Sequence, residues 1–199
     1  MLDNAGTRAI AAHILDPIAK VLLALRMSAS SITVLGALGS IAVSVVLVAQ
    51  GDFLLAAVLM LPLAGADAID GTMARIAGTQ GPWGAFLDST TDRITDGAIF
   101  ASIAWWFLRA GDTSAAIAAL VALIAGFVTS YSRAKAESLD VECKVGIAER
   151  PERVGGVMLG IFLAGLGFDV MLPVLVYVIA VLSCITVLQR VLVVRRALG

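Results

Sequence analysis

Stretches of about 20 apolar residues constrain this chain more than any other feature, because a membrane-spanning helix requires such a stretch. The sequence predicts six spans, at residues 32–50, 53–66 with a charged continuation to 75, 84–108, 114–132, 154–168 and 170–194. Composition agrees, since 60% of the 199 residues are hydrophobic and 15% are charged. A soluble globular enzyme, a disordered chain and a nucleic-acid binder are excluded. We therefore predict an all-α integral membrane protein with six transmembrane helices, embedded in a lipid bilayer.

The segment before the first span has a different pattern. Ile14, Ile18 and Leu22 recur at helical spacing, while Asp16 and Lys20 lie away from them, which predicts an amphipathic helix in the membrane interface. A cleavable signal peptide is disfavoured by the charges inside the segment, and a loose tail is the alternative. We predict a single domain over residues 1–199, with an interfacial helix over 1–30 and a six-helix transmembrane core over 31–196.

The basic residues are distributed unevenly about the predicted spans. Of the 14 lysines and arginines, all but Arg109 fall on the side that holds both termini and the connection between the fourth and fifth spans. Positive residues accumulate on the cytoplasmic side of membrane proteins. The pattern predicts a multi-pass plasma-membrane protein with both termini, and the site described next, on the cytoplasmic side.

Aspartates interrupt the second and third spans. Asp67 and Asp70 are three residues apart and Asp88 and Asp92 are four apart, so each pair shares one helical face. Counted from the outer ends of their spans, both pairs reach a similar depth near the cytoplasmic edge. Because carboxylates inside a span are costly, they indicate function. We expect these four carboxylates to converge, with Asp96 one helical turn beyond.

Four converging carboxylates need cations to remain ionised together. Oxygen ligands select Mg²⁺, Mn²⁺ or Ca²⁺, and bridging carboxylates favour a two-metal site. Gly71, Ala74 and Gly84 leave room for a large ligand, and Arg75 offers a charge for a phosphate. The alternative is a cation pathway through a transporter. The small residues and the arginine favour a lipid head group carrying phosphate.

The acids form part of a longer motif: Asp67-x-x-Asp70-Gly71-x-x-Ala74-Arg75, eight residues, then Gly84-x-x-x-Asp88-x-x-x-Asp92. This pattern resembles the signature of the CDP-alcohol phosphotransferase family of integral membrane enzymes. The family also carries a Pro-Asn before a Thr-x-x-Gly at the first span. Here Thr33 and Gly36 match, whereas Ala29 and Ser30 replace the Pro-Asn, a departure at the entry to the nucleotide pocket.

The resemblance implies an enzyme in which an acceptor hydroxyl displaces CMP from CDP-diacylglycerol. It implies that Asp67, Asp70 and Asp88 bind two divalent cations per active site, Mg²⁺ or Mn²⁺, and that Asp92 is both a ligand and the general base. The residues implied to line the CDP-diacylglycerol side are Gly71, Ala74, Arg75, Thr33 and Gly84. Asp96 lies outside the motif, where a supporting or packing role is favoured over a ligand role. The family also implies a homodimer, and Gly160, Gly165 and Gly167 predict close helix packing.

The acceptor is predicted from basic residues at the ends of the later spans, which suit an acceptor that already carries a phosphate. The candidates for its phosphate are Lys135, Arg153 and Arg195, followed by Arg133, Arg150 and Arg196. Segments 130–137 and 149–153 resemble the phosphatidylinositol-phosphate synthases of actinobacteria, which use inositol 1-phosphate. A phosphatidylglycerophosphate synthase using glycerol 3-phosphate is the alternative. A purely topological role is the competing interpretation for each basic residue.

Overall fold

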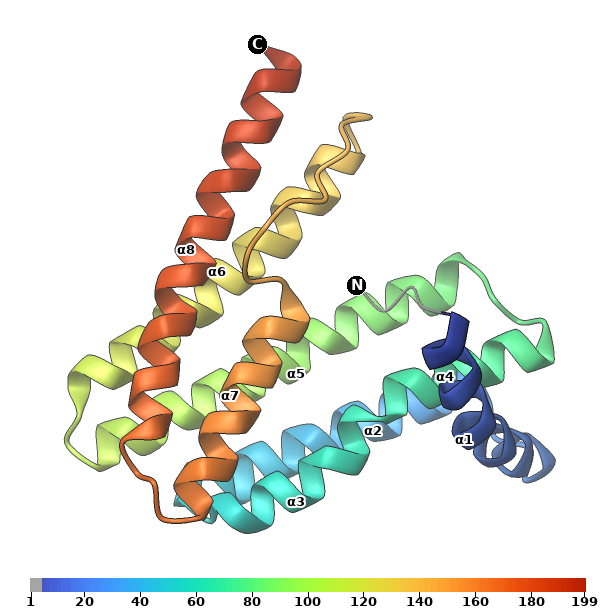
Figure 1. Ribbon diagram of the computed structural model, residues 1–199, viewed down its shortest axis with the longest axis horizontal. Helices are drawn as coiled ribbons and strands as arrows, with labels where there is room; N and C mark the ends of the chain where they lie inside the picture. Colours follow the sequence, from blue (N-terminus) through green and yellow to red (C-terminus); the bar gives the residue numbers. More distant parts are fainter. Residues whose placement is uncertain (1–4) are drawn as a thin grey trace. The chain divides into compact units, whose positions relative to one another are not determined.

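A computed structural model describes the backbone of residues 5–199 and the side chains of residues 15–199. All regular secondary structure in this part of the chain is helical, as predicted (Figure 1). In order, the elements are α1 (Ala5–Ala24), α2 (Ala29–Val46), the short 3-10 helix η1 (Val48–Gln50), α3 (Phe53–Ala64), α4 (Ala66–Ala77), α5 (Pro82–Arg109), α6 (Thr113–Glu137), α7 (Arg150–Gly165) and α8 (Met171–Leu198). Helix α1 takes the place of the predicted interfacial helix, of which residues 1–4 lie outside the described part.

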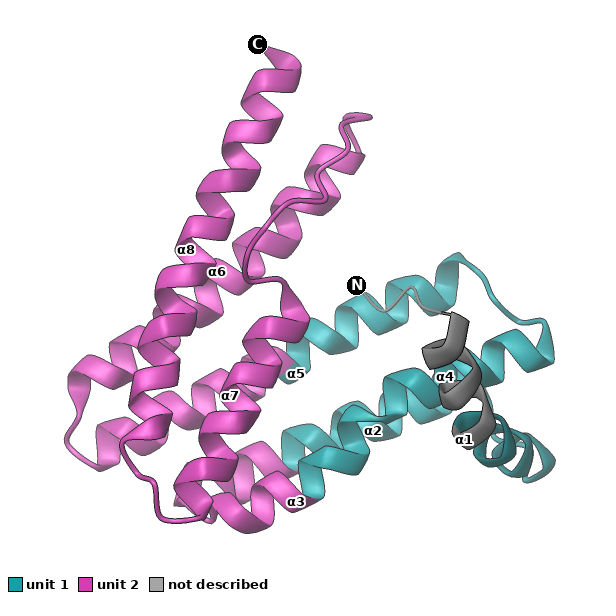
Figure 2. Cartoon of the chain, viewed as in Figure 1, with its two compact units in different colours: residues 1–42, 59–95 teal, residues 43–58, 96–199 magenta. Residues whose placement is uncertain are grey.

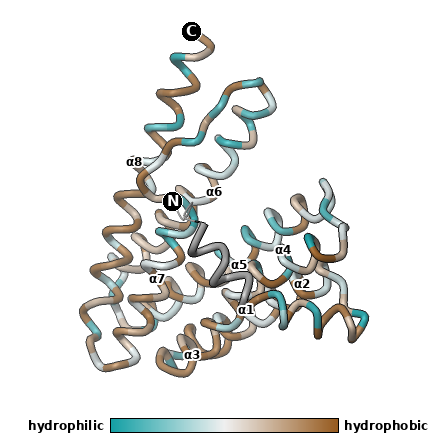
Figure 3. Tube along the Cα trace, turned by 45° about the vertical axis from the view of Figure 1, so that its right-hand side comes forward, coloured by the Kyte–Doolittle hydropathy of each residue, from teal (hydrophilic) through white to brown (hydrophobic). Residues whose placement is uncertain are grey.

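Four segments in the described part of the chain are long and apolar enough to cross a membrane. They are Ala29–Gln50, Phe53–Ala77, Thr113–Glu137 and Met171–Leu198. Figure 3 shows the hydrophobic residues along α3 and α8 in particular. Of the remaining two predicted spans, α7 has only 16 residues. The other, α5, carries the charged residues Asp88, Asp92, Arg93 and Asp96. The chain is therefore a multi-pass helical membrane protein, and six as the number of spans stays a prediction.

The second predicted span consists of two helices. Pro62 in the last turn of α3 has no N–H to donate, and the N–H of Gly65 bonds to the carbonyl of Pro62 at 3.2 Å. Helix α4 starts directly afterwards, at Ala66, and has Asp67 in its first turn. The break in the apolar helix thus falls just before the first of the aspartates.

The chain forms two compact units (Figure 2). Unit 1 comprises residues 1–42 and 59–95, and unit 2 comprises residues 43–58 and 96–199. Within unit 1, α1 packs on α4. Helix α2 also approaches α4 closely, because a Cβ on Gly36 would lie 2.7 Å from the Cβ of Ala66. Glycine at position 36 therefore permits the contact that places α2 beside the aspartates of α4.

Within unit 2, α6 and α7 both pack against α8. The close packing predicted at two of the glycines is confirmed inside the chain. A Cβ on Gly160 would lie 3.1 Å from Leu172 of α8, and a Cβ on Gly165 would lie 2.5 Å from the backbone nitrogen of Leu54. At Gly167 a Cβ would meet nothing within 4 Å, but the φ of +95° favours glycine in the turn after α7.

Candidate active site

Three of the predicted aspartates gather in unit 1. One carboxylate oxygen from each of Asp67, Asp70 and Asp88 lies within 4.8 Å of the other two. Asp67 and Asp70 come from successive turns of α4, and Asp88 comes from the second turn of α5. Asp70 is buried, Asp88 is half-buried and Asp67 is exposed. The group therefore has one open side.

A hydrogen bond from another helix holds the buried carboxylate. The hydroxyl of Thr33, on α2, donates to Oδ2 of Asp70, and both residues are buried. Thr33 was predicted on the CDP-diacylglycerol side from its place in a motif. In the structure its contact is with Asp70, so it orients a carboxylate of the three-residue group.

The fourth aspartate of the motif has a different neighbour. The carboxylate of Asp92 lies 3.5 Å from the guanidinium of Arg93, and its side chain is 14% exposed. It is not one of the three grouped carboxylates. A half-buried carboxylate one turn along α5 from Asp88 can accept a proton, which is the chemistry of a general base.

The surroundings of the acids are open on the side of the small motif residues. A Cβ on Gly71 or Gly84 would meet nothing within 4 Å. Ala74 is half-buried beside them on α4. Arg75 is exposed and forms an ion pair of 3.0 Å with Asp16 of α1. Sequence reasoning missed this pair, which joins the predicted interfacial helix to the motif.

The residues present fit hard divalent cations. Three carboxylates within 4.8 Å repel one another unless a positive charge lies between them. An all-oxygen donor set is what Mg²⁺ and Mn²⁺ prefer. Asp67, Asp70 and Asp88 would hold such an ion, with space for further oxygen ligands beside Gly71 and Gly84.

The six basic residues predicted for the acceptor's phosphate all belong to unit 2. The structure brings two of them together. Arg150 and Arg153 both approach Asp96, at 3.3 Å and 3.8 Å. Arg133 instead pairs with Glu137 one turn along α6, at 2.9 Å. The other three basic candidates are exposed, near the ends of α6 and α8: Lys135, Arg195 and Arg196.

A family model for CDP-alcohol phosphatidyltransferases matches residues 26–189. The chain belongs to this family. The match runs through both units and includes every motif residue named above, although Arg195 and Arg196 lie beyond it.

The relatives and solved structures described next are all phosphatidylinositol phosphate synthases. The phosphatidylinositol phosphate synthase of Streptomyces avermitilis is 37% identical over 97% of this chain and 82% of its own length. That of Corynebacterium glutamicum is 38% identical over 89% of this chain and 82% of its own. The fold is similar to a crystal structure of Mycobacterium tuberculosis phosphatidylinositol phosphate synthase with CDP-DAG bound, with a TM-score of 0.87, 35% identity and coverage of 92% and 94% of the two chains. A structure of the same enzyme in complex with manganese and citrate gives a TM-score of 0.88.

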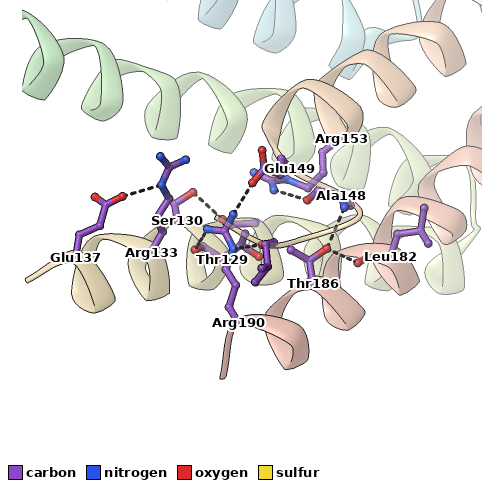
Figure 4. Close-up of polar contacts among 12 residues, drawn as sticks. Thr129, Ser130, Arg133, Glu137, Ala148, Glu149, Arg153, Leu182, Thr186 and Arg190 are labelled. Carbon is purple, nitrogen blue, oxygen red and sulfur yellow. Dashed lines mark hydrogen bonds and ion pairs between the residues drawn. The ribbon is translucent and has the colours of Figure 1, made fainter. Parts of the chain in front are cut away.

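One arginine of the present chain has a structural role that sequence reasoning missed. Arg190, on α8, is buried, and its Nε and Nη1 donate to the carbonyls of Val145 and Thr129, each at 2.8 Å (Figure 4). Its Nη2 lies 3.0 Å from Glu149. The hydroxyl of Thr186 accepts from the N–H of Ala148 at 3.0 Å. Helix α8 thus fixes the connection between α6 and α7. The available signal was an arginine inside an apolar span.

Replacing Arg190 by methionine is expected to lower the free energy of unfolding by about 3 kcal/mol, because one buried and one half-buried carbonyl lose their donors. Thermal unfolding in detergent would measure the change. Arg196→Met, at the exposed end of α8, is the matched control. Equal unfolding temperatures for the two variants would contradict the role assigned to Arg190.

Proposed function

We propose that this chain transfers the phosphatidyl group of CDP-diacylglycerol to inositol 1-phosphate, forming phosphatidylinositol phosphate and releasing CMP. The observation that carries the transfer is the grouping of Asp67, Asp70 and Asp88 within 4.8 Å, beside glycines that leave open space. The choice of acceptor is supported by relatives that are phosphatidylinositol phosphate synthases at 37–38% identity over most of the chain.

In the proposed reaction the acceptor hydroxyl attacks the phosphorus that carries the diacylglycerol. The bond from this phosphorus to the bridging oxygen breaks, and CMP leaves with the electron pair of that bond. Asp92 accepts the proton of the attacking hydroxyl. Two divalent cations, Mg²⁺ or Mn²⁺, would neutralise the diphosphate and stabilise the charge on the departing CMP when bound to this site.

The chain's own residues divide the remaining tasks. Thr33 fixes Asp70 through its hydrogen bond. Gly71, Ala74 and Gly84 leave space along the donor lipid's nucleotide and phosphates. Arg75 exchanges Asp16 for a phosphate of the donor, since a guanidinium binds either oxyanion. The basic residues of unit 2 receive the phosphate of the acceptor: Lys135, Arg153, Arg195, Arg133, Arg150 and Arg196.

The setting of the reaction is part of the proposal. We place the protein in the plasma membrane as six spans after an interfacial helix, forming one domain over residues 1–199. Both termini and the site face the cytoplasm, where water-soluble acceptor and CMP are exchanged. The distribution of lysine and arginine supports this orientation. Two copies of the chain form a homodimer.

A competition assay tests the acceptor. Purified protein with CDP-diacylglycerol and Mg²⁺ is offered inositol 1-phosphate, inositol, glycerol 3-phosphate and serine together, and the lipid products are identified by mass spectrometry. Phosphatidylinositol phosphate is the expected main product. Phosphatidylglycerophosphate as the main product would replace the proposed acceptor by glycerol 3-phosphate.

A further inference from the structure

Asp96 is a buried carboxylate that the family signature does not include. It is 4% exposed, and its two oxygens face different arginines at the start of α7. Oδ1 lies 3.3 Å from Nε of Arg150, and Oδ2 lies 3.8 Å from Nη2 of Arg153. Buried carboxylates are rare unless they are paired, and here one carboxylate pairs with two guanidinium groups.

The two arginines differ in exposure. Arg153 is 2% exposed, and its Nη1 donates to the carbonyl of Ala148 at 3.0 Å (Figure 4). A Cβ at Gly126 of α6 would lie 3.1 Å from its Nε, so the guanidinium fills the space beside this glycine. The side chain of Arg150 is 29% exposed. Asp96 therefore joins one fully enclosed guanidinium to one that reaches the surface.

The charges of this cluster leave it positive. Two guanidinium groups against one carboxylate give the cluster formed by Asp96, Arg150 and Arg153 a net charge of +1. A planar guanidinium binds a phosphate in a fixed geometry only when its own plane is fixed. Removing Asp96 would leave the positive charges in place but release the plane of Arg150, while Arg153 keeps its hydrogen bond to Ala148.

We propose that Asp96 is a positioning residue for the acceptor: the enclosed Arg153 holds its carboxylate, and the carboxylate orients Arg150, whose guanidinium reaches the surface, to bind the acceptor's phosphate. This inference rests on the proposed function, since it requires a phosphorylated acceptor. Asp96 touches no reacting atom and acts only through Arg150. Its loss should therefore weaken binding of the acceptor and leave binding of CDP-diacylglycerol unchanged.

Steady-state kinetics of CMP release separate this role from a purely structural one. Asp96→Asn is expected to raise the KM for the phosphorylated acceptor by about 10-fold, in the range of coupling between neighbouring charged groups. The KM for CDP-diacylglycerol should stay at the wild-type value, and Asp96→Glu should recover part of the loss. Asp169→Asn, in the exposed connection between α7 and α8, is the matched control.

A double-variant cycle tests whether the effect passes through Arg150. Arg150→Gln alone should raise the acceptor KM, and Asp96→Asn should add less in that background than in the wild type. Multiplicative effects would overturn the proposal. So would an unchanged acceptor KM in folded Asp96→Asn protein, or equal rises in both KM values. If Asp96→Asn yields no folded protein, an unchanged acceptor KM in Asp96→Glu and Arg150→Gln would overturn it.

Failure of the proposed function gives a different result. The kinetics use the acceptor that supports CMP release by the wild type. Wild-type activity with glycerol 3-phosphate alone would reject inositol 1-phosphate, while a selective rise of the glycerol 3-phosphate KM in Asp96→Asn would still support the positioning role. Activity with unphosphorylated inositol alone would reject both proposals.

Discussion

Asp92→Asn is expected to lower kcat for CMP release by about 10²- to 10⁴-fold, the usual contribution of a general base. The amide has nearly the shape of the carboxylate but does not take up the proton of the attacking hydroxyl. The KM for CDP-diacylglycerol should change little, since Asp92 lies outside the group formed by Asp67, Asp70 and Asp88. Steady-state CMP release by purified protein measures both parameters.

The concentration of metal separates the two roles assigned to Asp92. If it acts as the base, Asp92→Asn stays slow at saturating Mn²⁺. If it acts only as a ligand, saturating Mn²⁺ restores the rate. Asp169→Asn removes an exposed carboxylate between α7 and α8 and serves as the control. Near-normal turnover of Asp92→Asn at ordinary Mn²⁺ concentrations would reject Asp92 as the base.

Asp70→Asn is expected to lower activity by about 10³-fold, because a divalent ion supplies several kcal/mol of charge stabilisation in the transition state. Asp70 is the buried member of the three-carboxylate group, so solvent water does not compensate for the negative charge that the substitution removes. Titration of Mn²⁺ binding by electron paramagnetic resonance, together with the activity at each Mn²⁺ concentration, measures the loss.

Thr33 gives this prediction a graded comparison. Its hydroxyl orients Asp70, and residues that orient metal ligands typically contribute about 10- to 100-fold in metal affinity. Thr33→Val should therefore weaken Mn²⁺ binding less than Asp70→Asn does. Thr33→Ser keeps the hydroxyl and should bind Mn²⁺ like the wild type. Wild-type Mn²⁺ affinity in Asp70→Asn would contradict the assignment of a metal site to these carboxylates.

Most of the site that sequence predicts lies within single helices. Spacings of three and four residues place Asp67 with Asp70, and Asp88 with Asp92, by helix geometry alone. The same reasoning placed Arg133 near the end of α6 but not against Glu137. The lengths of the apolar stretches predicted the all-helical membrane fold for the same reason. Like the spacing of the aspartates, they are local features of the sequence.

Apart from the approach of Asp88 to Asp67 and Asp70, which depth along the spans predicted, contacts between helices were outside the reach of that reasoning. Thr33 and Asp70 are 37 residues apart, and their hydrogen bond depends on how closely Gly36 lets α2 approach α4. Sequence reasoning counted Arg153 among the candidates for the acceptor's phosphate and Arg190 among the basic residues of the cytoplasmic side, yet both are buried. Their partners include backbone carbonyls, which carry no signal in the residue type.

The most direct test of phosphatidyl transfer is the balance of products from purified wild-type protein in detergent, given CDP-diacylglycerol, Mg²⁺ or Mn²⁺ and inositol 1-phosphate. CMP and phosphatidylinositol phosphate should form in equal amounts, and neither should form when the divalent cation is chelated or the acceptor is omitted. CMP release that continues without any acceptor would contradict phosphatidyl transfer. Ion flux through proteoliposomes without a lipid substrate, with no CMP formed, would contradict it as well.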